Sequence, residues 1–481
     1  MQPTDNHIVA TALVALVALA AVTSGAAAGT ATDASTATTE LASCQTIDEP
    51  GTYTLASDVE SAAGDCFRVT ADYVTIYANG HTVAGNGSGA AFVASGVERV
   101  TVRNVTLTDW ETGVSLRDVT GGGVYGASVE NAAVVGVALD DSTGVFVREN
   151  DVADSTTGVS VTGESDGSVV VGNHVENVTG TGIAVSSDET EVVANDVVDA
   201  GGSAVRVSAA RTVTVADNTV SGSVGGIAVA ESGDVTVRGN DVEAVTGSAV
   251  EVVGEPSAST ARPEFLDASW AHYDAEALTA LFEDARRDAE NRVVNNTLAG
   301  ATGPGVLLAE TTPATVSGNS ITDTDDGVRV AQTSNVTVRG NDVTASRDDG
   351  VAVANASHNT VTGNDLLNST DDGVYAVGAG NEFANNTARG SGDDGLDVQN
   401  STDVVVASNV LSDNGDDGLY FRGVHNSTAV ENTARGNGDD GLDLRGSTGN
   451  VAENNTVCGN DHHGIVQRLG AQNNTVTGNG C

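Results

Sequence analysis

The chain has 481 residues and a formal net charge of −46, and its 20 basic residues are all arginines. This balance excludes nucleic acid as a natural partner, because a phosphate backbone requires clustered cations. So much negative charge opposes a compact state unless concentrated salt screens it, so the composition indicates a protein of a salt-loving organism.

The N-terminus carries an apolar run, Ile8–Val22, followed by small residues. This pattern is typical of a secretory signal peptide, predicted here over residues 1–28, and the run is short for a membrane span; an uncleaved anchor is the alternative. The Ser- and Thr-rich residues that follow predict a flexible leader over 29–43. No second hydrophobic segment closes the chain, so we expect a secreted or cell-surface protein without a transmembrane anchor after signal removal.

From residue 44 onwards the sequence repeats every 22 or 23 residues. An asparagine recurs in step with the repeat, at Asn150, Asn173, Asn195, Asn218, Asn240, Asn296, Asn319, Asn341, Asn364, Asn386, Asn409, Asn432 and Asn455. A strictly periodic asparagine predicts a column of side-chain amides that hydrogen-bond along the stack, which is a structural role.

Each repeat contains short apolar segments, rich in β-branched residues and separated by turn residues. In one repeat we predict strands at Leu396–Val398, Val404–Ala407 and Val410–Leu411. Three strands and three corners per coil indicate a parallel β-helix, in which equivalent residues of successive coils lie ~4.8 Å apart. We therefore expect an all-β solenoid domain over residues 44–481, with about sixteen coils.

These repeats resemble the right-handed parallel β-helix family, the pectin-lyase-like superfold, in its version with short PbH1-type repeats. The segment Cys44–Gly89 is similar to the start of NosD-type copper-accessory proteins and of related archaeal surface proteins. The resemblance implies a right-handed, single-stranded solenoid. It leaves the activity open, because the superfold includes lyases, hydrolases, epimerases and proteins without catalytic activity. The lysine base of some family lyases and the Asp motifs of the pectin hydrolases are both missing from this sequence.

One segment, Glu255–Arg292, interrupts the repeat. Its apolar residues fall on one helical face, and Asp274 is a suitable N-cap, so we predict a helical insertion over 255–292. The helix could simply cover the flank of the solenoid. Alternatively, it could act as a lid or as a partner-binding element over a groove.

The tripeptide DDG occurs six times at the repeat interval, each time opening a strand. Its carboxylates are Asp325, Asp326, Asp348, Asp349, Asp371, Asp372, Asp393, Asp394, Asp416, Asp417, Asp439 and Asp440. Stacked corners of this kind should attract cations, and calcium, which prefers several oxygen ligands, is the candidate cofactor. The alternative is an acidic corner neutralised by bulk sodium or potassium, with the glycine supplying a left-handed turn.

The strand after each DDG alternates inward and outward residues, which predicts an outward column of Arg329, Ala352, Tyr375, Asp397, Tyr420, Asp443 and Val466. A second outward column holds Gln399, Arg422, Arg445 and Arg468. Asp397 and Asp443, two coils apart, are the candidate catalytic carboxylates. The candidate substrate-binding residues are Tyr375, Tyr420, Arg422, Arg445, Arg468, His425, His462 and His463. Arginine binds carboxylates in bidentate fashion, and aromatic rings offer flat faces to sugars.

This pattern favours a secreted protein that binds or processes an extracellular, acidic polysaccharide, as a hydrolase, lyase or epimerase if it is an enzyme. The alternative is that these are ordinary surface residues of a non-catalytic accessory protein. Such a protein could handle metal or copper like the NosD-type family, with the three histidines as its only clustered soft ligands.

The four cysteines are spaced by one repeat at each end of the chain. Residues one coil apart have Cα atoms about 5 Å apart, within the range of a disulfide. We predict Cys44–Cys66 and Cys458–Cys481, each closing an end coil of the solenoid.

Overall fold

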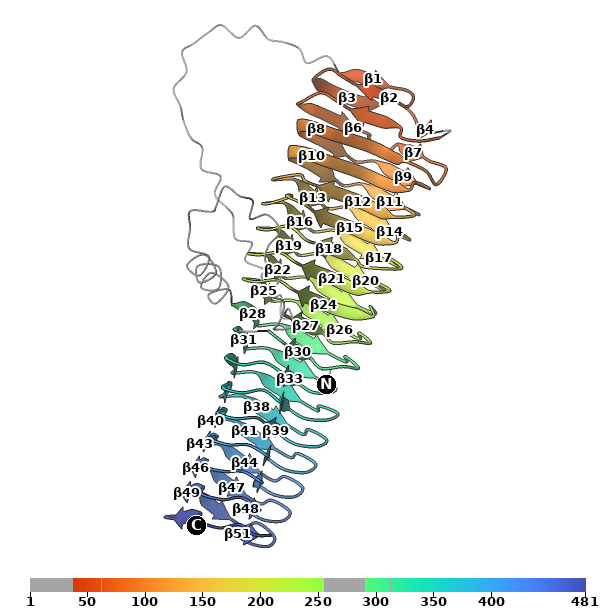
Figure 1. Ribbon diagram of the computed structural model, residues 1–481. Helices are drawn as coiled ribbons and strands as arrows, with labels where there is room; N and C mark the ends of the chain where they lie inside the picture. Colours follow the sequence, from red (N-terminus) through yellow and green to blue (C-terminus); the bar gives the residue numbers. More distant parts are fainter. Residues whose placement is uncertain (1–37, 62, 255–289, 312) are drawn as a thin grey trace, which may run out of the picture. The chain divides into compact units, whose positions relative to one another are not determined.

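The computed structural model describes residues 38–61, 63–254, 290–311 and 313–481. Within these residues the chain forms 52 short strands and no helix, wound into successive coils (Figure 1). Every strand pair is parallel, and nearly all pairs join residues about one repeat apart, as where Tyr420 pairs with Asp397 before it and Asp443 after it. Pairs across the segment that interrupts the repeat, such as Val250 with Val306, are further apart in the sequence. The predicted parallel β-helix is thereby confirmed.

Three ladders of strands run along the stack. The first consists of β2 (Gln45–Ile47), β5 (Phe67–Val69), β8 (Ala90–Arg103), β10 (Thr112–Tyr125), β12 (Val135–Asp140), β15 (Thr157–Thr162), β18 (Ile183–Val185), β21 (Ser203–Ser208), β24 (Gly225–Ala230), β27 (Val250–Val253), β30 (Val306–Ala309), β33 (Val328–Ala331), β36 (Val351–Ala354), β39 (Val374–Val377), β42 (Leu396–Gln399), β45 (Leu419–Arg422), β48 (Leu442–Arg445) and β51 (Ile465–Arg468).

The second ladder shares the long strands β8 and β10 with the first. Its other members are β1 (Thr39–Leu41), β3 (Gly51–Leu55), β6 (Val74–Tyr77), β13 (Phe146–Arg148), β16 (Val169–Val171), β19 (Glu191–Val193), β22 (Thr214–Ala216), β25 (Thr236–Arg238), β28 (Asn291–Val294), β31 (Ala314–Ser317), β34 (Val336–Arg339), β37 (Thr360–Thr362), β40 (Glu382–Ala384), β43 (Val405–Ala407), β46 (Thr428–Val430), β49 (Val451–Glu453) and β52 (Thr475–Thr477).

The third ladder consists of β4 (Val59–Glu60), β7 (Thr82–Ala84), β9 (Thr106–Thr108), β11 (Ser128–Glu130), β14 (Asp151–Ala153), β17 (His174–Glu176), β20 (Asp196–Val198), β23 (Thr219–Ser221), β26 (Asp241–Glu243), β29 (Thr297–Ala299), β32 (Ser320–Thr322), β35 (Asp342–Thr344), β38 (Asp365–Leu367), β41 (Thr387–Arg389), β44 (Val410–Ser412), β47 (Thr433–Arg435) and β50 (Thr456–Cys458).

The interior is filled by the apolar residues that alternate along each strand. In β48, Leu442 and Leu444 are buried, as the period-two pattern predicts. The largest buried side chain, Trp110, lies near the N-terminal end and donates Nε1–H to the Val83 carbonyl at 2.9 Å. The core therefore extends along the stack, and every coil contributes apolar side chains to it.

A column of buried asparagines runs along the stack from Asn150 to Asn455, as predicted. Asn386 is typical: its Oδ1 accepts from the backbone N–H and the Nδ2 of Asn364 at 3.0 and 2.9 Å. Its own Nδ2 donates to the Val361 carbonyl and to Asn409 Oδ1, at 2.9 and 3.1 Å. Each amide thus satisfies buried polar groups of both neighbouring coils, which fixes the register between them.

Both predicted disulfides are present. Cys44 and Cys66 have Cα atoms 4.3 Å apart, and Cys458 and Cys481 have Cα atoms 5.3 Å apart. Each bond joins equivalent positions of adjacent coils and closes one end of the described stack.

Two domain boundaries differ from the sequence-based expectation. Thr39–Leu41 lies within the expected leader but forms β1, which pairs with β3 because Leu41 completes the core and is fully buried. Asn291 and Arg292, expected to end the insertion, belong to β28, where Asn291 Oδ1 accepts from the Val235 N–H at 3.1 Å.

Other predicted segments lie outside the described residues. These are the signal peptide, the leader up to residue 37 and the helical part of the insertion over 255–289. In the part of the chain that the structure describes, no helix is long and apolar enough to span a membrane.

Candidate functional site

The six DDG corners lie directly before β33, β36, β39, β42, β45 and β48. The first Asp of each pair reaches the surface, whereas the second is buried, with exposed fractions between 0% and 6%. Oδ1 of each buried Asp accepts the backbone N–H of the equivalent residue one coil further on, at 2.7 Å from Asp394 to Asp417. The backbone of the next coil therefore holds each buried carboxylate in place.

The glycine of DDG is required by close packing and not by the left-handed turn considered above. None of the six glycines has a positive φ. A Cβ atom at Gly418 would lie 2.6 Å from Ala434 Cβ, 2.7 Å from Asn437 Nδ2 and 2.8 Å from the Gly441 carbonyl oxygen. The glycine therefore lets the corner approach the third ladder, which places the preceding Asp in the interior.

Carboxylates of neighbouring corners form five groups of three, each made of the buried Asp of one coil and both Asp of the next. In each group, one oxygen per residue lies within 4.8 Å of the others. The groups are Asp326, Asp348 and Asp349; Asp349, Asp371 and Asp372; Asp372, Asp393 and Asp394; Asp394, Asp416 and Asp417; and Asp417, Asp439 and Asp440. We call this arrangement the aspartate column.

Burial raises the pKa of the buried carboxyl groups, and mutual repulsion raises it further. Burial, with repulsion from Asp397, raises the pKa of Asp372 to about 9, and burial with repulsion from Asp372 raises the pKa of Asp394 to about 10. At one end of the column, burial raises the pKa of Asp326 only to about 6, because the Arg329 guanidinium opposes the rise. In solutions without bound cations, the middle of the column therefore holds protons at neutral pH.

Beside the aspartate column lies the predicted outward column Asp397–Tyr420–Asp443, in the expected register. The two carboxylates are not exposed as outward residues usually are: Asp397 is 5% and Asp443 is 2% exposed. Asp397 Oδ2 accepts from Gln399 Nε2 at 2.5 Å, and Asp443 Oδ2 lies 3.6 Å from Arg468 Nη1. Oδ1 of both residues is buried without a hydrogen-bond partner.

The arginine column lies next to these carboxylates, with Gln399, Arg422, Arg445 and Arg468 in register on successive coils. Arg445 donates from Nη1 to the Tyr420 hydroxyl at 3.1 Å, and its guanidinium carbon lies 6.0 Å from the Tyr420 ring centre. Arg468 forms an ion pair with Asp440, whereas Arg422 is exposed. The arginines therefore form a row of positive charge beside the row of aspartates.

Together these side chains enclose a cavity of about 310 Å³, which we call the C-terminal groove. It is lined by Asp393, Asp394, Asp397, Gln399, Asp416, Asp417, Tyr420, Arg422, Asp439, Asp443, Arg445 and Arg468. The structure thus brings together both candidate catalytic residues, one of the two candidate tyrosines and all three candidate arginines.

The remaining candidate residues do not line this groove. Tyr375 lies one coil before Asp397, and His425 bonds through Nδ1 to Thr448 Oγ1 at 2.8 Å. His462 and His463 occupy the DDG position of the next coil, where they contact Asp439 and Asp440, His463 through Nδ1 at 2.8 Å. Gln399, identified in sequence only as part of the arginine column, does line the groove and holds Asp397.

A protein-family model described as "Right handed beta helix region" matches residues 64–242, 285–387 and 349–481. The chain belongs to this family. No curated protein matches the sequence.

Solved structures that are similar to parts of this β-helix protein include a glucanase, a tailspike protein and an epimerase. The catalytic unit of an α-1,3-glucanase of family GH87 from Streptomyces thermodiastaticus is 18% identical, with a TM-score of 0.44 over 62% of this chain and 60% of its own. A tailspike protein of E. coli bacteriophage HK620, solved with a pentasaccharide, is 11% identical, with a TM-score of 0.44 over 78% and 72% of the two chains. The periplasmic alginate epimerase AlgG is 11% identical, with a TM-score of 0.30 over 82% and 77%.

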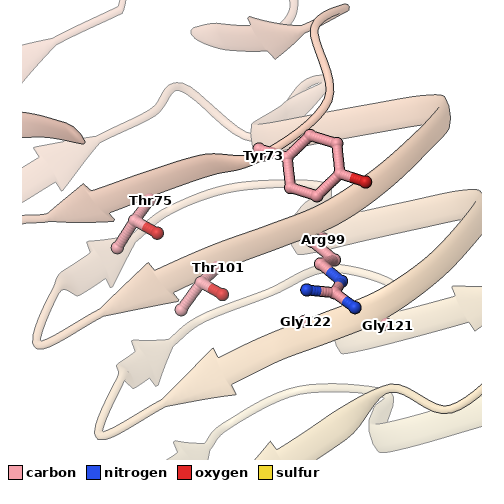
Figure 2. Close-up of a pocket in the computed structure, with 6 residues that line it drawn as sticks. All are labelled: Tyr73, Thr75, Arg99, Thr101, Gly121 and Gly122. Carbon is pink, nitrogen blue, oxygen red and sulfur yellow. The ribbon is translucent and has the colours of Figure 1, made fainter. Parts of the chain in front are cut away.

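A second cavity, of about 360 Å³, lies on β6, β8 and β10 near the N-terminal end of the β-helix. Figure 2 shows Tyr73, Thr75, Arg99, Thr101, Gly121 and Gly122 around it. Tyr73 donates its hydroxyl to Glu98 Oε2 at 3.0 Å, and the Arg99 guanidinium carbon lies 5.7 Å from its ring centre. This cavity contains no carboxylate among its lining residues, so the chemistry of the C-terminal groove is absent there.

Proposed function

We propose that this protein binds and processes an extracellular acidic polysaccharide in the C-terminal groove. The observation that carries the proposal is the pair Asp397 and Asp443. Both are more than nine-tenths buried, both have an Oδ1 atom without a hydrogen-bond partner, and both line the same groove. Leaving a buried acceptor unpaired costs about 1–3 kcal/mol, and the hydroxyl groups of a sugar would satisfy both atoms.

The groove suits an anionic glycan because its cations lie at one edge. Arg422 is exposed and Arg445 is half-buried, so each can bind a uronate carboxylate in bidentate fashion. Tyr420, which lies between the two carboxylates and is fixed by Arg445, offers a ring face to a sugar. A chain of net charge −46 repels acidic polymers elsewhere, so these arginines would select where the polymer binds.

The two carboxylates also suit acid–base catalysis. They are two coils apart, roughly 9–10 Å for a regular stack, near the upper end of the separation in inverting glycoside hydrolases. Burial raises the pKa of Asp397 to about 6, so it can donate a proton to a leaving glycosidic oxygen near neutral pH. Burial also raises the pKa of Asp443, but Arg468 and Arg445 oppose the rise, so Asp443 is the better base to activate water.

The proposal includes export of the protein to an oxidising compartment. Two disulfides at the ends of the stack are stable outside the cytosol, where such polymers occur. The predicted signal peptide and the high acidity agree with secretion by a salt-loving organism.

The test is incubation of the purified protein with a panel of acidic polysaccharides, monitoring new reducing ends, unsaturated uronates and C5 epimers. We expect turnover that falls at least ~100-fold in Asp397→Asn and in Asp443→Asn, while glycan affinity changes only several-fold. Asp365→Asn, a change at an exposed carboxylate in β38, is the matched control and should keep full activity.

Absence of turnover on every polymer, or equal activity in all three variants, would overturn the catalytic proposal. Glycan binding without turnover would instead support the alternative, a non-catalytic surface or accessory protein. Copper handling has less support, because no potential metal cluster among the described residues includes a histidine or cysteine.

A further inference from the structure

We propose that the aspartate column is a row of calcium sites, each formed between two successive DDG corners. The proposal does not require glycan binding, although both proposals use the unpaired oxygens of Asp397 and Asp443. Each of the five groups offers three carboxylates whose oxygens lie within 4.8 Å of one another. An ion with bonds of about 2.4 Å, the length typical of calcium, can bridge oxygens this far apart, whereas bonds of about 2.1 Å to magnesium span less. The groups supply oxygen ligands only, which favours a hard cation such as calcium over zinc or copper.

At each end of the aspartate column, an arginine of the protein pairs with the buried carboxylate. At the first corner, Asp326 Oδ2 lies 3.2 Å from Arg329 Nη1. At the last corner, Asp440 forms an ion pair with Arg468, and its Oδ1 lies 2.8 Å from His463 Nδ1. The protein thus supplies its own cations where the column begins and stops.

The middle of the column has no such partner. Among the described residues, no arginine or histidine forms an ion pair with the buried carboxylates Asp349, Asp372, Asp394 or Asp417. Only Oδ1 of each is hydrogen-bonded, to the next backbone N–H. Buried carboxylates need a compensating charge when they are ionised, and cations from solution would supply it in place of the protons that these groups otherwise hold.

A second, independent observation points to a ligand at the same place. Asp397 Oδ1 and Asp443 Oδ1 are buried, have no hydrogen-bond partner and line the C-terminal groove together with members of the column. Asp397 lies close enough to Asp372 to raise its pKa, and Asp443 has the same effect on Asp417. Cations bound in the groups nearest to each residue, or water molecules bound to those cations, would satisfy these two oxygens separately.

The charge balance agrees with this arrangement. Five divalent ions, together with Arg329 and Arg468, would neutralise the twelve carboxylates of the six DDG corners. Successive ions would lie about one coil apart, ~4.8 Å. The buried carboxylate shared by adjacent groups lies between them and would screen their repulsion.

The test uses the full-length protein, stripped with a chelator and kept in about 1 M KCl, where exposed charges are screened within about 3 Å. Titration calorimetry with calcium chloride should give several ions per chain and at most five. The same titration with magnesium chloride should give at least ~10-fold weaker binding. In the double variant Asp372→Asn/Asp394→Asn, three of the five groups lose a ligand, so the number of bound ions should fall by about half or more.

The matched control is Asp342→Asn/Asp365→Asn. These two residues also face each other on adjacent coils, but both are exposed, so the ion count should not change. Circular dichroism of each variant in chelator checks folding, which loss of buried charge should preserve. No calcium binding in KCl, an unchanged count in the column variant, or equally tight magnesium binding would overturn the proposal. None of these measurements involves a glycan.

Discussion

Replacing Asp397 by Asn should stabilise the C-terminal coils at alkaline pH while it removes activity. Burial raises the pKa of Asp397 from 3.8 to about 6. The unfolded chain therefore loses this proton near pH ~4 and the folded chain only near pH ~6, so stability falls as the pH rises through that window. Two pKa units correspond to about 3 kcal/mol, and the loss is complete above the folded pKa. An amide of the same shape carries no such penalty and can still accept from Gln399.

The assay is hydrogen exchange of peptides that cover β42 and β45, because exchange distinguishes local opening of these coils from unfolding of the whole stack. Wild type, Asp397→Asn and the exposed control Asp365→Asn are compared in chelator at about pH 4 and pH 8. We expect up to ~3 kcal/mol more protection in Asp397→Asn at the higher pH, little difference at the lower pH and no change in the control. Equal protection at pH ~8, or a gain of the same size at both pH values, would refute the reasoning.

Three further predictions concern the stack itself. Asn386→Ala should cost about 4 kcal/mol, because it leaves several buried groups unpaired, whereas Asn385→Ala, at an exposed residue with φ 55°, should cost only about 1 kcal/mol in urea unfolding. Gly418→Ala should lower stability by about 1–3 kcal/mol through overpacking; an unchanged melting temperature would contradict the close approach described above. Reduction of Cys458–Cys481 should speed hydrogen exchange in the last coil and leave the coils before β45 unchanged; a uniform increase would contradict a local role.

The strict period made the fold and the alignment of side chains predictable. Once one repeat was divided into strands, every equivalent residue fell into a column, so Tyr420 was correctly placed between Asp397 and Asp443. The same logic paired the cysteines. It required no long-range information, because in a stack the partner of each residue lies one period away.

The burial of Asp397 and Asp443 could not be predicted in this way. A period of two predicts which face of a strand a residue occupies, but how deeply its side chain is buried depends on the neighbouring side chains and turns. Here the DDG corners and the arginine column line the groove together with Asp397 and Asp443. The position of the DDG corners depends on how their glycines pack against the third ladder. The suggestion that these glycines supply a left-handed turn was wrong for a similar reason. Their real constraint is a close approach between coils, which leaves no signal in the local sequence.

The asparagine and aspartate columns share one property: in both, each coil is completed by the coil after it. A structure of this kind has no inherent last unit, and an uncapped end would expose to solvent the asparagine donors and the aspartate acceptors that the next coil normally pairs. In the last described coil the aspartate column stops, because His462 and His463 occupy the position of a seventh acidic pair. Deleting that coil would expose the unpaired edge of β48 and β49, so self-association of the shortened protein is the expected result.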